Sequence, residues 1–171
     1  MEIGESIVGA YLRQIRKCHL VTFNQFVPGT QAEIDVIGVG AAGREVWLCE
    51  VTTHIRGFLL SGSVDAERNK MLAKLATLQA YAVDVFPDST HHFEWWTPYV
   101  PVGQRTGFMD ELVEEWASNR RSLRFVRNED YTERVQELVD HAASNASITV
   151  DPAYRMLQIL TRLRGGGVTL S

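Results

Sequence analysis

The sequence predicts an α/β protein in which a mixed central β-sheet is flanked by helices. Three observations predict this class: successive β-rich segments within residues 19–54, a run of helix formers over 65–86, and a fourth β-rich segment at 90–100. With 171 residues, 45% of them hydrophobic, the chain can bury one sizeable core. We therefore expect a single domain spanning residues 1–171.

The N-terminal part is expected to supply one helix and three strands. Residues 3–17 place apolar side chains on one stripe at helical spacing, namely Ile3, Ile7, Val8, Tyr11, Leu12 and Ile15. Strands are predicted at 19–27, 32–39 and 45–54, which are rich in β-branched and aromatic residues and are separated by turn-forming glycine and proline. Because these connections are short, the three strands are expected to form a meander.

A long helix and a fourth strand follow. Residues 65–86 contain many helix formers and end at Pro87, and an apolar stripe runs through Met71, Leu75, Leu78 and Ala82. Residues 90–100 are dense in aromatic side chains, which favours a strand. These elements would complete a core over about residues 1–100.

The remaining chain is expected to be a mostly helical extension over about 101–164, with a flexible tail at 165–171. Its predicted elements are a short helix at 108–119, a short strand at 123–127, and helices at 129–144 and 151–164.

Composition and charge narrow the location and the class of function. No apolar run approaches the roughly 20 residues that span a bilayer, and Glu2 and Glu5 stand where a signal peptide would be basic, so we expect a cytoplasmic protein without a membrane partner. Cys18 and Cys49 lie in apolar segments and are expected to be reduced core residues. The sequence has no glycine-rich phosphate loop and no serine elbow.

Two acidic residues stand where strands favour apolar ones. Asp35 interrupts the segment EIDVIGV, and Glu50 interrupts the segment LCEVTT. If these two strands pair as a hairpin, the two carboxylates can lie side by side. Carboxylates held that close repel each other unless a cation lies between them, and Mg²⁺ is commonly bound by one or two carboxylates. The pattern therefore favours a metal site formed by Asp35 and Glu50.

This arrangement resembles the PD-(D/E)XK nuclease superfamily, the restriction-endonuclease-like enzymes. Their core runs helix, three strands, helix, strand, with an acidic residue in the second strand and Glu-x-Lys in the third. The matching positions here are Asp35 and Glu50, with Glu5 matching a further glutamate on the first helix of many members. The resemblance covers roughly residues 1–100. It departs at Thr52, which replaces the lysine of Glu-x-Lys and carries no charge.

The resemblance implies a metal-dependent endonuclease that hydrolyses phosphodiester bonds in DNA and that forms a homodimer. Mg²⁺ or Mn²⁺ would bind Asp35, Glu50 and the backbone carbonyl of Val51, while Glu5 would hold a second metal or orient the attacking water. In some members the lysine comes from the following helix, where Lys70 is the first candidate and Lys74 the second. If no lysine serves, the domain would be an inactive nucleic-acid-binding or protein-interaction module.

Each candidate residue also has a structural interpretation. Glu5 would be a solvated residue in the first turn of a helix. Asp35 would accept hydrogen bonds within the hairpin, Glu50 would pair with an arginine such as Arg56, and Lys70 and Lys74 would be surface charges.

Aromatic and basic side chains later in the chain leave similar alternatives open. The aromatic residues would either stack on bases or pack in the core, and these are Phe93, Trp95, Trp96 and Tyr99. The arginines would either bind phosphates or belong to a polar segment that leads into a strand, and these are Arg120, Arg121, Arg124 and Arg127.

Overall fold

The computed structural model describes residues 2–53, 63–101, 107–117 and 120–165 and has the α/β class that the sequence predicts. The elements, in chain order, are α1 (Ile3–Gln14), β1 (Leu20–Phe26), β2 (Glu33–Val39), the short 3₁₀ helix η1 (Ala41–Gly43), β3 (Glu45–Val51), α2 (Val64–Val85), β4 (Thr90–Thr97), α3 (Phe108–Trp116), β5 (Arg121–Arg127), α4 (Asn128–Ser144) and α5 (Pro152–Gly165).

The five strands form one mixed sheet in the order β1-β2-β3-β4-β5. Strands β1, β2 and β3 pair antiparallel, which confirms the predicted meander. Strands β3, β4 and β5 pair parallel to one another. Parallel neighbours require a crossover connection, and α2 supplies it between β3 and β4.

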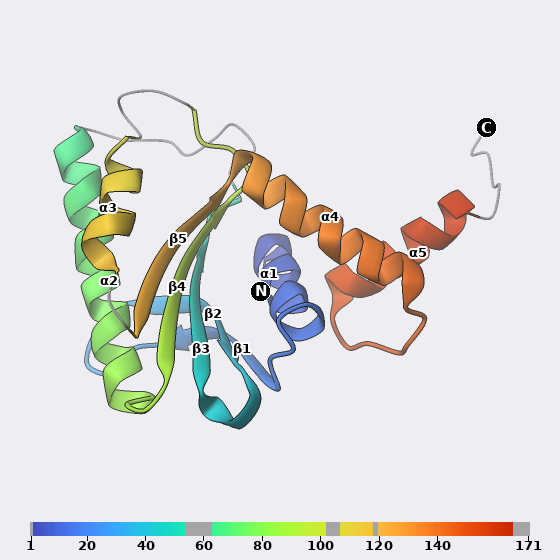
Figure 1. Ribbon diagram of the computed structural model, residues 1–171, viewed down its shortest axis with the longest axis horizontal. Coiled ribbons are helices and arrows are strands. Elements are labelled where there is room, and N and C mark those ends of the chain that lie inside the picture. The colour runs from blue at the N-terminus through green and yellow to red at the C-terminus, as the bar shows by residue number, and fades with distance from the viewer. Residues whose placement is uncertain (1, 54–62, 102–106, 118–119, 166–171) are drawn as a thin grey trace.

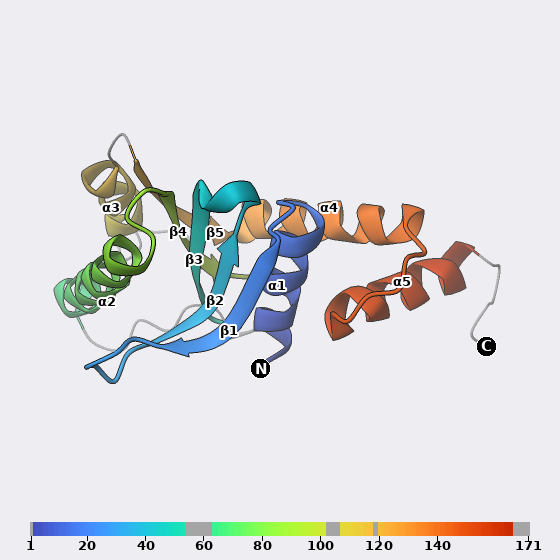
Figure 2. The same cartoon turned by 90° about the horizontal axis from the view of Figure 1, so that it is seen from below.

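Helices cover both faces of the sheet. In Figure 1, α2 and α3 lie on one side, whereas α1 and α4 lie on the other. Figure 2 shows α5 packed beside α4 at the end of the molecule away from α2 and α3. The buried side chains of α2 share one core cluster with Ile34 of β2, Leu48 of β3 and Phe93 of β4, so this helix covers the middle of the sheet.

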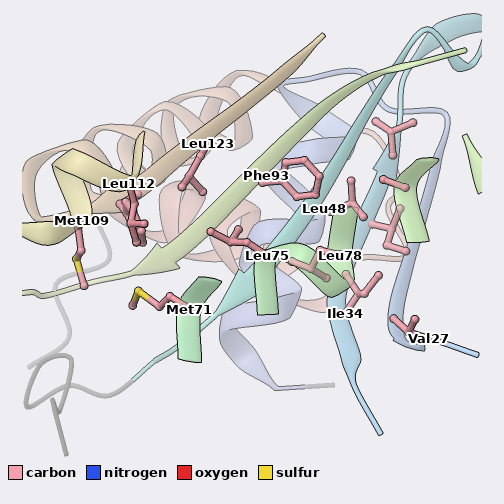
Figure 3. Close-up of a cluster of buried hydrophobic side chains, with 14 of the residues drawn as sticks. Val27, Ile34, Leu48, Met71, Leu75, Leu78, Phe93, Met109, Leu112 and Leu123 are labelled. Carbon is pink, nitrogen blue, oxygen red and sulfur yellow. The ribbon is translucent and has the colours of Figure 1, made fainter. Parts of the chain in front are cut away.

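The face of the sheet under α2 and α3 contains one apolar core cluster, shown in Figure 3. Leu48 of β3 and Phe93 of β4 are almost fully buried there. The predicted stripe of α2 packs onto them and is buried as expected through Met71, Leu75, Leu78 and Ala82.

The opposite face of the sheet packs against α1 and α4. Trp47 and Cys49 of β3 and Trp96 of β4 are buried there, together with Leu12 of α1 and Leu138 of α4. Side chains alternate along β3 between the two clusters, so Leu48 and Cys49 face different helices. Cys18 and Cys49 are buried and form no disulfide with each other, as expected for core residues.

Several elements end at other residues than the sequence predicts, for local reasons. Helix α1 ends at Gln14 because Lys17 adopts a left-handed backbone (φ 59°), which lets the Cys18 N–H close the helix on the Leu12 carbonyl at 3.0 Å. Strand β4 ends at Thr97 because Pro98 cannot donate to the ladder. Strand β5 begins at Arg121, two residues before the prediction.

The ends of some predicted segments lie outside the described residues. These are residue 54 of the third strand, residues 118–119 of the short helix, and residues 166–171 of the tail. Within the described part of the chain, no helix is long and apolar enough to cross a membrane.

Candidate functional site

Strands β2 and β3 bring Asp35 and Glu50 together at the end of their pairing. The ladder pairs Val36 with Cys49, so Asp35 and Glu50 occupy the next position along it. Asp35 Oδ2 accepts a hydrogen bond of 2.6 Å from the backbone N–H of Val51. Because side chains alternate along a strand, Glu50 shares with Leu48 the face covered by α2. The predicted neighbourhood of the two carboxylates is therefore present.

Glu50 is buried, and only one of its two carboxylate oxygens has a partner among the described residues. Its side chain is 10% exposed, and Oε2 lies 3.1 Å from the ammonium Nζ of Lys74. Its other oxygen, Oε1, is buried and has no hydrogen-bond partner among the described residues. Leaving a carboxylate oxygen buried and unbonded is costly, because a charged group out of water needs a partner. A cation or a hydrogen-bond donor beside Oε1 would therefore stabilise the charged form of Glu50.

The electrostatics of the pair follow from burial and from mutual repulsion. The pKa of Glu50 is raised to about 8, chiefly by burial and next by the negative charge of Asp35, while Lys74 partly opposes both effects. The pKa of Asp35 is also raised, chiefly by burial, although the Val51 N–H and Lys74 lower it. A cation placed beside both carboxylates would relieve this repulsion and lower both pKa values.

The structure brings Lys74, and not the first candidate Lys70, to these carboxylates. Besides contacting Glu50, Lys74 Nζ donates a hydrogen bond to the backbone carbonyl of Glu33 on β2. Lys70 has a side chain that is 64% exposed, and it pairs with Glu67 at 3.0 Å. One turn of α2 therefore separates a lysine held at the site from a surface lysine.

Thr52 and Glu5 border the site. The backbone N–H of Thr52 donates 2.8 Å to the Trp96 carbonyl, which aligns the chain just after Glu50 with β4. Glu5 is buried on α1, so it is not a solvated first-turn residue, and its carboxylate accepts 2.9 Å from the backbone N–H of Glu2. Its charge contributes to the raised pKa of Asp35. Glu5 is thus both a helix-capping residue and an electrostatic neighbour.

The donor set at this site consists of oxygens. No group of at least three His, Cys, Asp or Glu side chains that could hold a metal ion occurs in the described ranges, so Glu5 does not complete such a group. Asp35 and Glu50 remain as two carboxylates, with the backbone of Val51 next to Asp35. Two carboxylates with carbonyl and water oxygens suit hard Mg²⁺, whose remaining positions are usually filled by water or substrate. The residues present therefore fit Mg²⁺ or Mn²⁺.

Comparisons with protein families, with curated proteins and with solved structures give no match for this chain. The assignment of chemistry thus rests on the geometry of Asp35, Glu50 and Lys74.

The structure agrees in part with the purely structural roles considered for Asp35 and Glu50. Asp35 accepts a hydrogen bond within the hairpin, as one alternative expects. Glu50 pairs with a lysine in the described part of the chain, and Arg56, the arginine considered for it, lies outside that part, as does His54 at the end of the predicted strand.

The aromatic side chains of β4 serve mainly as core. Phe93 and Trp96 are almost fully buried, and Trp95 stacks on Phe125 with ring centroids 6.3 Å apart. Tyr99 differs from them because it is 51% exposed. Packing therefore accounts for the strand residues, while Tyr99 is a surface aromatic.

The arginines considered for phosphate binding have partners within the protein. Arg124 forms a two-bond pair with Asp130, and Arg127 pairs with Asp110 at 2.6 Å. Arg121 donates to the Trp116 carbonyl at 2.7 Å, and Arg120 donates to the Ser89 carbonyl at 3.2 Å. These contacts favour a structural role, although Arg121, Arg124 and Arg127 lie within β5 itself and not in a polar segment that leads into it.

Sequence reasoning missed another buried carboxylate in the sheet, that of Glu94 on β4. Arg134 of α4 donates to both of its oxygens, at 3.1 and 3.0 Å, and Trp96 Nε1 donates at 2.8 Å. Arg134 also lies over the rings of Trp96 and Tyr11. The sequence signal for Glu94 resembles that for Glu50: an acidic residue stands within a strand-forming segment, here HHFEWW. The partner that marks it as structural lies 40 residues away.

Proposed function

We propose that this protein is a metal-dependent nuclease that hydrolyses phosphodiester bonds in DNA at a site formed by Asp35, Glu50 and Lys74. The observation that carries the proposal is the buried Glu50, which has one oxygen on the Lys74 ammonium and the other without a partner among the described residues. Membership in the PD-(D/E)XK superfamily is part of the proposal and is supported by the order of elements from α1 to β4. The free cysteines suit a cytoplasmic setting.

The chain's own groups would hold Mg²⁺ or Mn²⁺ through Asp35, Glu50 and the Val51 carbonyl. Such a cation, when bound, polarises a phosphate oxygen and lowers the pKa of a water. The protein's contribution is to keep two carboxylates adjacent in a partly dry position, where their repulsion disfavours the empty site. The hydrogen bond from Val51 fixes the orientation of Asp35.

Lys74 would supply the charge that Thr52 lacks. An ammonium has three donors, and the contacts with Glu50 and with the Glu33 carbonyl use two of them. The third can donate to a phosphate oxygen, where it would stabilise negative charge that develops during hydrolysis. The carbonyl of Glu33 fixes the ammonium on β2, so its position does not depend on Glu50 alone.

The second candidate function is a binding module that has lost catalysis, which Thr52 favours. The placement of Lys74 weighs against it, because a lysine does reach the carboxylates from α2.

The test is cleavage of labelled single-stranded, duplex and four-way-junction DNA in Mg²⁺ or Mn²⁺. We expect Asp35→Ala to reduce cleavage by about 1000-fold or more and Lys74→Met by about 100-fold, since each removes a group that acts on the reacting phosphate. Lys70→Met is the matched control, on the same helix and of the same chemistry, and should remain within about twofold of the wild type.

Two results would count against this assignment. An equal loss of cleavage in Lys70→Met and Lys74→Met would show that Lys74 has no specific role in catalysis. Absence of cutting by folded wild-type protein on every substrate would favour the inactive module.

A further inference from the structure

Helix α5 presents an apolar stripe to solvent. Its members follow helical spacing and are 43–54% exposed, namely Met156, Ile159, Leu160 and Leu163. The segment just before the helix adds Ile148 and Val150, which are 89% and 86% exposed. Single exposed apolar residues are ordinary, but a contiguous apolar face is typical of an interaction surface.

The other side of α5 is fixed to the protein, so this stripe is held outward. Tyr154 is buried and its hydroxyl lies 2.6 Å from His141 Nδ1 of α4. Gln158 is buried and donates 2.7 Å to the Asn145 carbonyl. Figures 1 and 2 both place α5 at the end of the molecule far from α2 and α3.

The charges beside the stripe are of one sign. Helix α5 contains three arginines, Arg155, Arg162 and Arg164, and no acidic residue. The exposed face of α4 has the opposite charge and carries Glu129, Glu133, Glu137 and Asp140. One chain therefore offers both a basic apolar surface and an acidic one on neighbouring helices.

We propose that the α5 stripe binds a second copy of this chain, with α5 of each subunit packing against the α4–α5 hairpin of the other. A two-fold dimer uses the same surface on both subunits, so that surface must be self-complementary. Pairing of α5 with α5 alone would place arginines beside arginines, whereas contact with α4 of the partner sets them against carboxylates. This inference does not depend on the proposed nuclease activity.

An anionic membrane surface is the competing occupant, because a basic amphipathic helix can lie on one. The acidic face of α4 beside α5 would be repelled by anionic lipid, and the chain has a net charge of −4. These charges favour a second protein copy.

Sedimentation velocity over a range of concentrations tests the dimer. We expect the wild type to dimerise and Ile159→Glu to weaken the dimer by about 100-fold or more, because each interface would bury the new charge twice. Val83→Glu is the matched control, since Val83 is 50% exposed on α2, far from this surface. Circular dichroism should show that both variants keep the wild-type fold.

A charge exchange tests the contact between α5 and α4. Arg162→Glu with Arg164→Glu should weaken self-association, and so should Glu133→Arg with Asp140→Arg, whereas a mixture of the two double variants should form a mixed dimer. Glu137 is left unchanged because it accepts a hydrogen bond from Tyr11.

A wild type that stays monomeric at every concentration would overturn the proposal. So would flotation of that monomer with phosphatidylglycerol vesicles, which would assign the stripe to lipid. Failure of the mixture to associate would overturn the contact with α4.

Discussion

Two buried glutamates on adjacent strands differ in how their charge is compensated. Glu94 of β4 and Glu50 of β3 lie one register step apart, since the ladder pairs Glu94 with Cys49 and Glu50 with Trp95. They point to opposite faces of the sheet. Glu94 meets a buried arginine and an indole N–H, whereas Glu50 meets one lysine and keeps an unbonded oxygen.

The difference separates a structural carboxylate from one suited to ligand binding. The surroundings of Glu94 satisfy its charged form with three hydrogen bonds from the protein itself. Those of Glu50 disfavour the charged form, as its pKa of about 8 indicates. Burial alone therefore does not distinguish the two glutamates, whereas the partners of their carboxylate oxygens do.

The largest effect should come from Glu94→Ala. Removing this carboxylate takes from the buried Arg134, which is 4% exposed, its closest ion-pair partner and leaves the Asp130 carboxylate 3.5 Å away. We expect a loss of about 3 kcal/mol in the free energy of unfolding, because the buried cation is then poorly compensated. Urea denaturation measures it. The double change Glu94→Leu with Arg134→Met should recover most of the loss, because it removes both charges. A cost below about 1 kcal/mol for the single variant would show that this pair does not hold α4 to the sheet.

Without divalent cations, we expect Glu50→Gln to raise the free energy of unfolding, by less than Glu94→Ala lowers it. Because the folded-state pKa of Glu50 is raised from 4.5 to about 8, its contribution to stability is fully present below pH 4.5 and is lost as the pH rises through 8. The glutamine variant avoids that loss and should be more stable than the wild type at pH 9, on the order of 2 kcal/mol. Thermal unfolding at pH 5 and pH 9 measures the difference. A variant less stable than the wild type at pH 9 would make Glu50 a structural residue like Glu94.

The smallest effect concerns proton release on metal binding. Below pH 8 Glu50 is mostly protonated, so binding of Mg²⁺ or Mn²⁺ should expel about one proton and the apparent affinity should rise with pH up to about 8. Calorimetry in buffers of different ionisation enthalpy measures the proton count, with Glu50→Gln as the variant that should release none. A pH-independent affinity would exclude Glu50 as a ligand.

Much of the fold could be predicted from local sequence patterns. The apolar stripe of α2 and the turn residues around β2 are periodic signals that depend only on neighbours in the chain. The ends of elements were less predictable. The left-handed Lys17 that ends α1 has no strong sequence signature, because lysine seldom adopts that backbone.

The site was predictable as far as its hairpin. Asp35 and Glu50 share one short hairpin, so strand alternation was enough to place them together. Lys74 could not be chosen over Lys70 from the sequence, because the choice depends on how α2 is rotated against the sheet. For the same reason Glu94 and Glu50 look alike in sequence, although of the two only Glu94 pairs with the distant Arg134.

The parallel pairing of β3 and β4 also sets the order in which this site can assemble. Asp35 and Glu50 belong to strands joined by five residues, 40–44, so their contact is local in the chain. Lys74 arrives only when the crossover has closed and α2 has docked, a step of higher contact order that is slower in folding. A partly folded chain can thus pair the strands that carry Asp35 and Glu50 before Lys74 reaches them. All three side chains come together only in the fully folded domain.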